Sequence, residues 1–326
     1  MRIPIIELTD LSKRYGSFLA VDQLNLTIYK GEIFGLLGPN GAGKTTSILM
    51  MLGLAEPTTG TAFVCGENAT RHPIAVKRKV GYLPDNVGFY DNLTGLENLT
   101  LIARLNGYKL EEADRKAKTL LAEVGLADHM HKKTAAYSRG MKQRLGLADV
   151  LIKQPEVVIL DEPTLGIDPT GVAEFLALIR RLSQQQGLTV LLSSHHLQQV
   201  QQICDRVGIF VSGRLLVEGT VDTLATNLFQ EEGYITTVNF KQLPPDMTTW
   251  ERTLGELKCV QQVKRHGTSL EIRCTADDTP TIVRCLVHLG ADITSVQRQT
   301  YTLDDIYTRY FENNLVVPHV HHTNQQ

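Results

Sequence analysis

The segment GPNGAGKT at residues 38–45 constrains the fold of this chain more than any other feature. It matches the pattern G-x-x-x-x-G-K-[ST], in which glycines let successive backbone N–H groups turn toward one point and bind phosphate. The apolar run Ile33–Leu37 precedes it and predicts a short buried strand. An apolar helix pattern follows, and the positive end of a helix dipole near Lys44 adds to the attraction for an anion. The sequence therefore predicts a strand, a phosphate-binding loop and a helix in succession.

The side chains of this loop predict contacts with a nucleoside triphosphate and Mg²⁺. Lys44 is placed for the β and γ phosphates, and the hydroxyl of Thr45 is placed for Mg²⁺. The residues predicted to contact the nucleotide here are Gly38, Pro39, Asn40, Gly41, Ala42, Gly43, Lys44, Thr45 and Thr46.

A second buried strand is predicted at residues 157–160, because four apolar residues with no polar face belong inside a sheet covered on both sides. This strand delivers Asp161 and Glu162 at its carboxyl end, where α/β sheets bind ligands. We expect Asp161 to hold Mg²⁺, directly or through a water. We expect Glu162 to orient or deprotonate a water beside the γ phosphate.

The run YSRGMKQR at residues 137–144 predicts a helix that Ser138 caps. A capped helix N-terminus with small residues is a second anion site. One chain does not need two γ-phosphate sites for one nucleotide, so this helix could reach the phosphate of a second copy of the chain. Spacing alone favours the alternative, which is a plain capped helix without a ligand.

Composition limits the class of protein. With 326 residues, of which 42% are hydrophobic, the chain can form one large domain and a smaller one. A net charge of −2 gives no general basic field, so sequence-independent nucleic-acid binding is not expected. Five scattered cysteines without a C-x-x-C pair favour free thiols in a reducing compartment. No stretch approaches the roughly 20 apolar residues that span a bilayer, so another chain is expected to do any spanning.

Strand and helix patterns alternate along the first two thirds of the chain, which predicts a mostly parallel sheet layered by helices. A mainly helical stretch is predicted at about 92–152, and its first helix opens with a capping box at residues 94–97. Asp168 and Pro169 predict the start of a later helix, as N-cap and first-turn proline.

The pattern of predicted elements changes near residue 219, where a second set of strands and helices begins. We therefore expect a large domain over residues 1–218, with a helical subdomain at about 88–152. A small accessory α+β domain with its own sheet is expected over residues 219–312, followed by a flexible tail over 313–326.

Five motifs follow one another in order: GPNGAGKT, YSRGMKQR, VVILDEP, LGIDP and LLSSHHLQQVQQICDRV. Over about residues 5–218 the chain resembles the ATP-binding subunit of ABC transporters. It is most similar to single-cassette ATPases that energise separate membrane subunits, often exporters. The resemblance implies an α/β P-loop NTPase fold, the ABC ATPase domain, with an inserted helical subdomain and a small C-terminal α+β domain.

The resemblance also implies ATP and Mg²⁺ as cofactors, and a homodimer that closes head to tail on two ATP molecules. The implied partner is a transmembrane permease subunit on a separate chain, and nucleic acid is not an expected partner. ATP hydrolysis would power transport, with export favoured. The implied location is cytoplasmic, peripheral on the inner face of the cell membrane.

Residue roles carry over from the matching motifs. Tyr15 falls where an aromatic ring stacks on adenine, and its alternative is core packing. Glu162 is the implied general base, and His195 aligns with the switch histidine in preference to His196. Ser138 and Gly140 belong to the signature that closes over the partner's γ phosphate. Lys44, Thr45 and Asp161 keep the phosphate and magnesium roles given above.

Two motifs depart from the common pattern of the family. Asp85 stands where glutamine is usual. Its carboxylate can still accept hydrogen bonds from a magnesium-bound water, but it cannot donate when ionised. Arg139 and Met141 stand in the signature where the common form has Gly and Gln, although this run is familiar in the exporter-like group.

Two other classes of function fit the sequence less well. A soluble ABC ATPase acting on nucleic acid or the ribosome usually carries a long inserted coiled coil or a second cassette, and neither is found here. A GTPase is disfavoured because the guanine-reading motif N-K-x-D is not found, and a small-molecule kinase does not explain YSRGMKQR.

Overall fold

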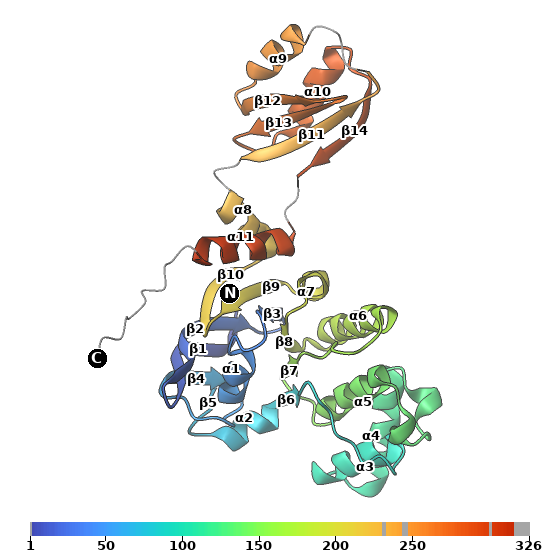
Figure 1. Cartoon of the computed structure of the whole chain (residues 1–326). Coiled ribbons are helices and arrows are strands. Elements are labelled where there is room, and N and C mark those ends of the chain that lie inside the picture. The colour runs from blue at the N-terminus through green and yellow to red at the C-terminus, as the bar shows by residue number, and fades with distance from the viewer. Residues whose placement is uncertain (1, 230–232, 243–246, 300–301, 316–326) are drawn as a thin grey trace, which may run out of the picture. The chain divides into compact units, whose positions relative to one another are not determined.

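The computed structural model describes residues 2–229, 233–242, 247–299 and 302–315. The chain divides into two compact units, Met1–Thr220 and Val221–Gln326. Among the described residues, a hydrophobic cluster lies within the first unit and another lies within the second. Each unit is therefore described by itself (Figure 1).

Two sheets build the first unit. One has four strands in the order β2-β1-β4-β5, and the other has six in the order β10-β9-β3-β8-β7-β6. The strands are β1 (Pro4–Tyr15), β2 (Phe18–Tyr29), β3 (Ile33–Leu37), β4 (Thr59–Val64), β5 (Glu67–Asn68), β6 (Val80–Leu83), β7 (Val157–Asp161), β8 (Thr189–Ser194), β9 (Arg206–Val211) and β10 (Arg214–Gly219).

The six-stranded sheet carries the predicted motifs. Strands β9, β3, β8, β7 and β6 pair in parallel, and only the pairing of β10 with β9 is antiparallel. Every residue of β3, β7 and β8 is buried, which explains why these strands are apolar without alternation. The predicted mostly parallel sheet is confirmed, but β1, β2 and β4 form a separate antiparallel sheet that the sequence did not reveal.

Parallel pairing brings three loops to one edge of this sheet. Leu37 pairs with Ser194, and Asp161 pairs with Ser193, so β3, β7 and β8 end side by side. The loops after these strands begin at Gly38, Glu162 and His195. Segments far apart in the sequence therefore meet where parallel sheets bind ligands.

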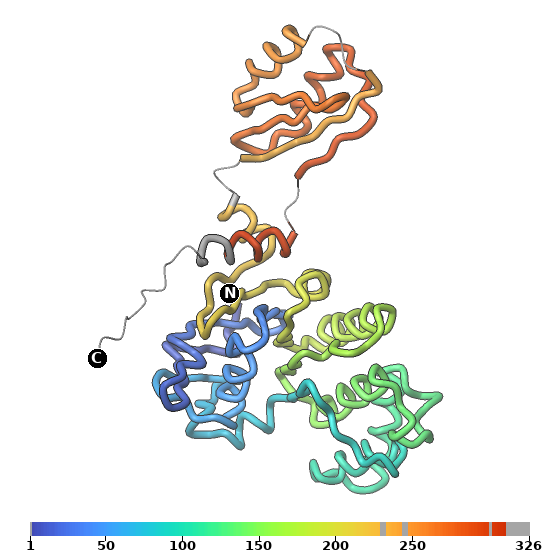
Figure 2. Tube along the Cα trace, viewed as in Figure 1, coloured from blue at the N-terminus to red at the C-terminus, as the bar shows by residue number. Residues whose placement is uncertain are grey.

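Helices of the first unit surround the strands and extend into a helical lobe. They are α1 (Lys44–Met51), α2 (Pro73–Lys79), α3 (Gly95–Leu105), α4 (Leu110–Glu123), α5 (Arg139–Leu151), α6 (Pro169–Gln186) and α7 (Leu197–Ile203), with 3₁₀ turns η1 (Ala127–His129) and η2 (Thr134–Ala136). In Figure 2 the green part of the trace, with α3, α4 and α5, forms a lobe beside the strands.

Local signals define the ends of these helices. The hydroxyl of Thr94 accepts a hydrogen bond from the Glu97 N–H, and the Glu97 carboxylate accepts one from the Thr94 N–H, which confirms the predicted capping box. Asp168 caps α6, and Gly187 ends it in a left-handed conformation, as glycine does most easily. Helix α2 was not predicted.

The second unit contains a four-stranded antiparallel sheet in the order β12-β13-β11-β14. Its elements are α8 (Val221–Phe229), β11 (Tyr234–Phe240), α9 (Thr248–Gly255), β12 (Val260–His266), β13 (Ser269–Cys274), α10 (Thr279–His288), β14 (Ile293–Arg298) and α11 (Leu303–Leu315). From β11 to β14 this is the split β-α-β-β-α-β arrangement of ferredoxin-like domains.

One face of this sheet packs on helices. Leu270, Ile272 and Cys274 alternate along β13 and are buried, as expected for a strand with one covered face. Trp250 and Leu254 on α9 join the same cluster. The sequence analysis predicted a small α+β domain with its own sheet here, but it did not predict α9. Of the predicted tail over 313–326, residues 316–326 lie outside the described residues.

Among the described residues, no helix is both long and apolar enough to cross a membrane.

Candidate active site

A cavity of about 590 Å³ opens at the carboxyl edge of the parallel sheet in the first unit. Most of the residues that the sequence analysis assigned to nucleotide or Mg²⁺ binding line this cavity. Those that line it are Asn40, Gly41, Ala42, Gly43, Lys44, Thr45, Thr46, Asp85, Asp161, Glu162 and His195. Tyr15, Gly38, Pro39, Ser138 and Gly140 were also predicted, but they are not among the described residues that line it.

The phosphate-binding loop is shaped by its glycines. Gly43 has φ of +105°, and a Cβ there would lie 2.3 Å from the carbonyl oxygen of Ala20, so no larger residue fits. Helix α1 starts at the next residue, Lys44, whose side chain is buried. The Lys44 ammonium donates hydrogen bonds to the carbonyl oxygens of Gly38 at 2.7 Å and Pro39 at 3.2 Å. These two residues therefore hold the lysine, although they do not line the cavity.

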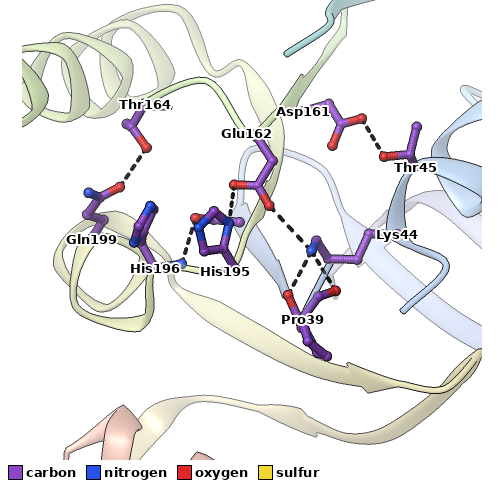
Figure 3. A network of polar contacts seen from close by, with 11 residues as sticks. Pro39, Lys44, Thr45, Asp161, Glu162, Thr164, His195, His196 and Gln199 are labelled. Atoms are coloured by element: carbon purple, nitrogen blue, oxygen red, sulfur yellow. Dashed lines mark hydrogen bonds and ion pairs between the residues drawn. The ribbon is translucent and has the colours of Figure 1, made fainter. Parts of the chain in front are cut away.

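The residues predicted for Mg²⁺ lie together at one corner. The hydroxyl of Thr45 donates a hydrogen bond to Oδ2 of Asp161 at 2.8 Å (Figure 3). Oδ1 of Asp161 is buried and has no hydrogen-bond partner within the described part of the chain. Burial raises the pKa of Asp161, and the nearby carboxylates of Glu162 and Asp85 add to the rise against the hydrogen bond from Thr45. An oxygen-rich corner with an unpartnered carboxylate oxygen fits a hard cation such as Mg²⁺.

Glu162 lies between a cation and an imidazole. Its Oε1 is 3.3 Å from Nζ of Lys44, and its Oε2 is 2.9 Å from Nδ1 of His195 (Figure 3). Its backbone has φ of +47°, a conformation that non-glycine residues rarely adopt, and its N–H bonds to the Ser193 carbonyl at 3.0 Å. Strained backbone of this kind concentrates at functional sites, where surrounding contacts hold it. An ionised carboxylate only accepts, so the contact with His195 needs the proton on Nδ1.

Further hydrogen bonds lie beside Glu162 and His195 (Figure 3). Thr164, which is 4% exposed, donates from its hydroxyl to Oε1 of Gln199 at 2.6 Å. The His196 N–H bonds to the Ser194 hydroxyl at 3.0 Å, and the His196 ring centroid is 3.9 Å from that of His195. Burial lowers the pKa of His196, which favours its neutral form. Local sequence patterns carry no signal for Thr164 and Gln199, because their contact joins the loop after β7 to α7.

The signature residues lie at the start of α5. The Ser138 hydroxyl accepts a hydrogen bond from the Met141 N–H at 3.2 Å, which confirms the predicted cap. Ser138 is exposed and Gly140 is partly exposed. In this single chain, their helix N-terminus is open rather than used by the cavity.

The aromatic wall of the cavity differs from the expectation. Tyr15 is 49% exposed, and the ammonium of Lys13 lies 5.0 Å from its ring centroid. The ring that lines the cavity is Phe18, at the other side of the same β1–β2 turn and 62% exposed. The other lining residues that the sequence analysis missed are Ala20, Tyr82 and Leu165.

Comparison with known proteins finds a matching family and close relatives in sequence. A family model described as ABC transporter matches residues 21–165. The bacitracin transport ATP-binding protein BcrA of Bacillus licheniformis is 44% identical over 220 residues, which cover 68% of this chain and 71% of that protein. The uncharacterized ABC transporter ATP-binding protein YhcH of Bacillus subtilis (strain 168) is 34% identical over 303 residues, covering 92% of this chain and 94% of that protein.

A solved structure, described as the ATP binding subunit of an ABC transporter, superposes with a TM-score of 0.61. It is 31% identical, and the match covers 68% of this chain and 92% of that one. The same fold is therefore known in an ATP-binding subunit of an ABC transporter.

Proposed function

This chain belongs to the ABC transporter family as an ATP-binding, ATP-hydrolysing subunit, and from that premise we propose that two copies close head to tail on two Mg-ATP. Closure and reopening would drive a separate transmembrane permease. We infer a peripheral position on the inner face of the cell membrane, where ATP is available and the permease is within reach.

The observation that carries this proposal is the division of the predicted residues. Lys44, Asp161, Glu162 and His195 line one cavity, whereas the open α5 N-terminus at Ser138 does not. A helix N-terminus with free N–H groups favours a negative charge. A second copy turned head to tail would supply that charge from its own ATP.

Hydrolysis follows from the contacts around Glu162. Lys44 now pairs with Glu162 and two loop carbonyls, and a triphosphate would draw its ammonium toward the phosphates. Glu162 would then keep His195 as its partner and accept a proton from water as that water attacks the γ phosphorus. The products are ADP and inorganic phosphate.

Mg²⁺ would be held by Thr45 and Asp161, with Asp85 accepting a hydrogen bond from a magnesium-bound water. When bound, the ion neutralises charge on the phosphate oxygens. The chain's own part is to keep these oxygens at one buried corner.

We infer export as the direction of transport. BcrA is described as a bacitracin transport ATP-binding protein, and the alignment with it is 220 residues long, which is the length of the first unit. We propose that the permease contacts the first unit around residues 85–97, where Tyr90 is 60% exposed. A push from the closing dimer would reach the membrane chain there.

The test is ATP turnover by the purified full chain, alone and with the permease encoded beside it. We expect hydrolysis in both forms, and a Glu162→Gln variant that binds ATP but accumulates as a closed dimer in light scattering. Glu174→Gln is the matched control, because this carboxylate is exposed and lies on α6 outside the cavity. Lack of ATPase activity in both forms would overturn the proposal.

A further inference from the structure

Arg139 is the first residue of α5 and stands between the two signature residues Ser138 and Gly140. Its guanidinium turns back toward its own chain instead of pointing along the open helix N-terminus. Nε donates a hydrogen bond to the carbonyl oxygen of Leu165, and Nη2 donates one to the carbonyl oxygen of Asp85 at 3.2 Å. One planar side chain therefore connects α5 to two separate loops.

Both acceptors belong to residues that line the nucleotide cavity. Asp85 lies in the loop after β6, and Leu165 lies in the loop that follows Glu162 after β7. Arg139 therefore connects two loops of the nucleotide cavity directly to the N-terminus of α5. Sequence spacing does not predict this contact, because Leu165 and Asp85 lie far from Arg139 along the chain.

The contact is fitted to its surroundings. Gly166, next to Leu165, has φ of +74°, and a Cβ there would lie 2.8 Å from Cδ and 2.9 Å from Nε of Arg139. The stem of the arginine thus occupies space that only glycine leaves free. A lysine could reach one carbonyl, but it does not have the fixed fork that bonds both at once.

The position of Arg139 also suits a contact that breaks and re-forms. The residue is exposed, and hydrogen bonds at exposed positions add little to folding stability. A side chain that bonds both loops can do so only while their carbonyls keep this spacing. A change at either loop when the cavity fills would be passed directly to the start of α5.

Resting on the proposed head-to-tail dimer, we propose that Arg139 is a positioning residue that couples the two ATP sites. It relates the filling of its own chain's cavity to the placement of Ser138 and Gly140 at the partner's ATP. Through it, binding of the first ATP prepares the signature for the second site. No direct contact of Arg139 with phosphate is needed.

The experiment measures ATP binding to the full chain at fixed protein concentration, with Glu162→Gln as the parent so that hydrolysis does not interfere. Coupling between two sites usually changes affinity by roughly 5–150-fold. We expect such a ratio between the first and second ATP in the parent, a ratio near one with Arg139→Gln, and an intermediate ratio with Arg139→Lys.

The matched control is Arg144→Gln. Arg144 is also on α5, and it also donates to a backbone carbonyl, that of Val124 at 3.1 Å, and pairs with Glu174 at 2.8 Å. None of these partners lines the nucleotide cavity. This variant should keep the parental ratio, even if it lowers the melting temperature.

Gly166→Ala gives an independent check, because the added methyl group displaces Arg139 without removing it. It should abolish coupling in the parent and add no further loss of coupling in the Arg139→Gln background. Equal weakening of both ATP sites by Arg139→Gln, with the parental ratio retained, would show direct phosphate contact and overturn the proposal. A parent that forms no ATP-dependent dimer contradicts the proposed function itself, and this inference with it, so the two failures are distinguishable.

Discussion

At the scale of single residues, the contacts of Glu162 explain how its buried carboxylate is held in place before ATP binds. The carboxylate is 13% exposed and is shared between the Lys44 ammonium and the His195 ring. The two partners, one on each carboxylate oxygen, offset part of the cost of burying this polar group. Substrate phosphates compete for Lys44 only, so Glu162 would keep its imidazole partner.

His195→Ala tests this arrangement. We expect ATP binding to persist and single-turnover hydrolysis to slow, but by less than the roughly 10²–10⁴-fold loss expected for Glu162→Gln. Because His195 would act mainly on Glu162, the double variant should be little slower than Glu162→Gln alone. Fully additive losses in quenched-flow measurements would show that His195 works independently of Glu162.

A second prediction concerns the adenine. We propose that Tyr15 stacks on the base and that Phe18 forms a side wall of the cavity. Base stacking on an aromatic ring contributes about 1–3 kcal/mol. Tyr15→Ala should therefore weaken ATP binding in calorimetry without changing the affinity for inorganic triphosphate, and Tyr15→Phe should restore it. If Phe18→Ala has the larger effect on ATP and Tyr15→Ala has none, the two roles are exchanged.

Sequence reasoning located the cavity residues that belong to motifs with a regular local spacing. The loop from Gly38 to Thr45, and the carboxylates after a buried strand, were identified from the pattern alone. The contact of Thr164 with Gln199 could not be predicted, because it depends on how β7 and β8 pair. The same applies to Phe18, which lines the cavity only because the β1–β2 turn folds over it.

At the scale of elements, the site depends on which strands end together. Apolar runs predicted β3 and β7, and continuous burial explains that success. Membership of a sheet is not a local property, so the separate antiparallel sheet of β1, β2 and β4 was missed. Helix α9 was missed although Trp250 and Leu254 have helical spacing, because the segment is short and polar elsewhere.

Two capped helices allow stability and function to be separated. Ser138→Ala and Thr94→Ala each remove an N-cap hydroxyl, and each should cost about 0.5–2 kcal/mol of unfolding free energy. Only Ser138→Ala should also lower ATP turnover of the isolated ATPase, because in the proposed dimer the N-terminus of α5, and not that of α3, meets the partner's ATP. Equal turnover of the two variants would mean that the α5 N-terminus is merely a capped helix end.

Helix α5 also predicts a pH dependence. Burial raises the pKa of Asp149 to about 6 from an ordinary value of 3.8, and the nearby Lys153 opposes this rise. Between these values the folded chain binds more protons than the unfolded one, so this group lowers stability as pH rises from about 4 to 6.

Asp149→Asn should therefore raise the unfolding free energy at pH 7.5 by about 1–3 kcal/mol, since each unit of pKa difference is about 1.4 kcal/mol. Urea denaturation at pH 7.5 and pH 5 measures the difference, and the gain should be smaller at pH 5. A gain that is the same at both pH values would mean that Asp149 is charged at no cost.

At the scale of the whole molecule, the chain combines two units with separate cores. All the described nucleotide-cavity residues lie in Met1–Thr220, while the ferredoxin-like sheet lies in Val221–Gln326. The sequence predicted a domain boundary near residue 219, because a new set of strand and helix patterns begins after it. The partner that we propose for the open α5 N-terminus is a second copy of the chain, so neither sequence spacing nor the contacts of one chain can test it.

The most direct measurement is a crystal or cryo-EM structure of the full-length Glu162→Gln protein with ATP and Mg²⁺. The account predicts two ATP molecules, each gripped by Lys44 of one subunit and covered by Ser138 and Gly140 of the other. Nucleotide bound in the cavity of a single chain, with Ser138 facing open solvent, would contradict it.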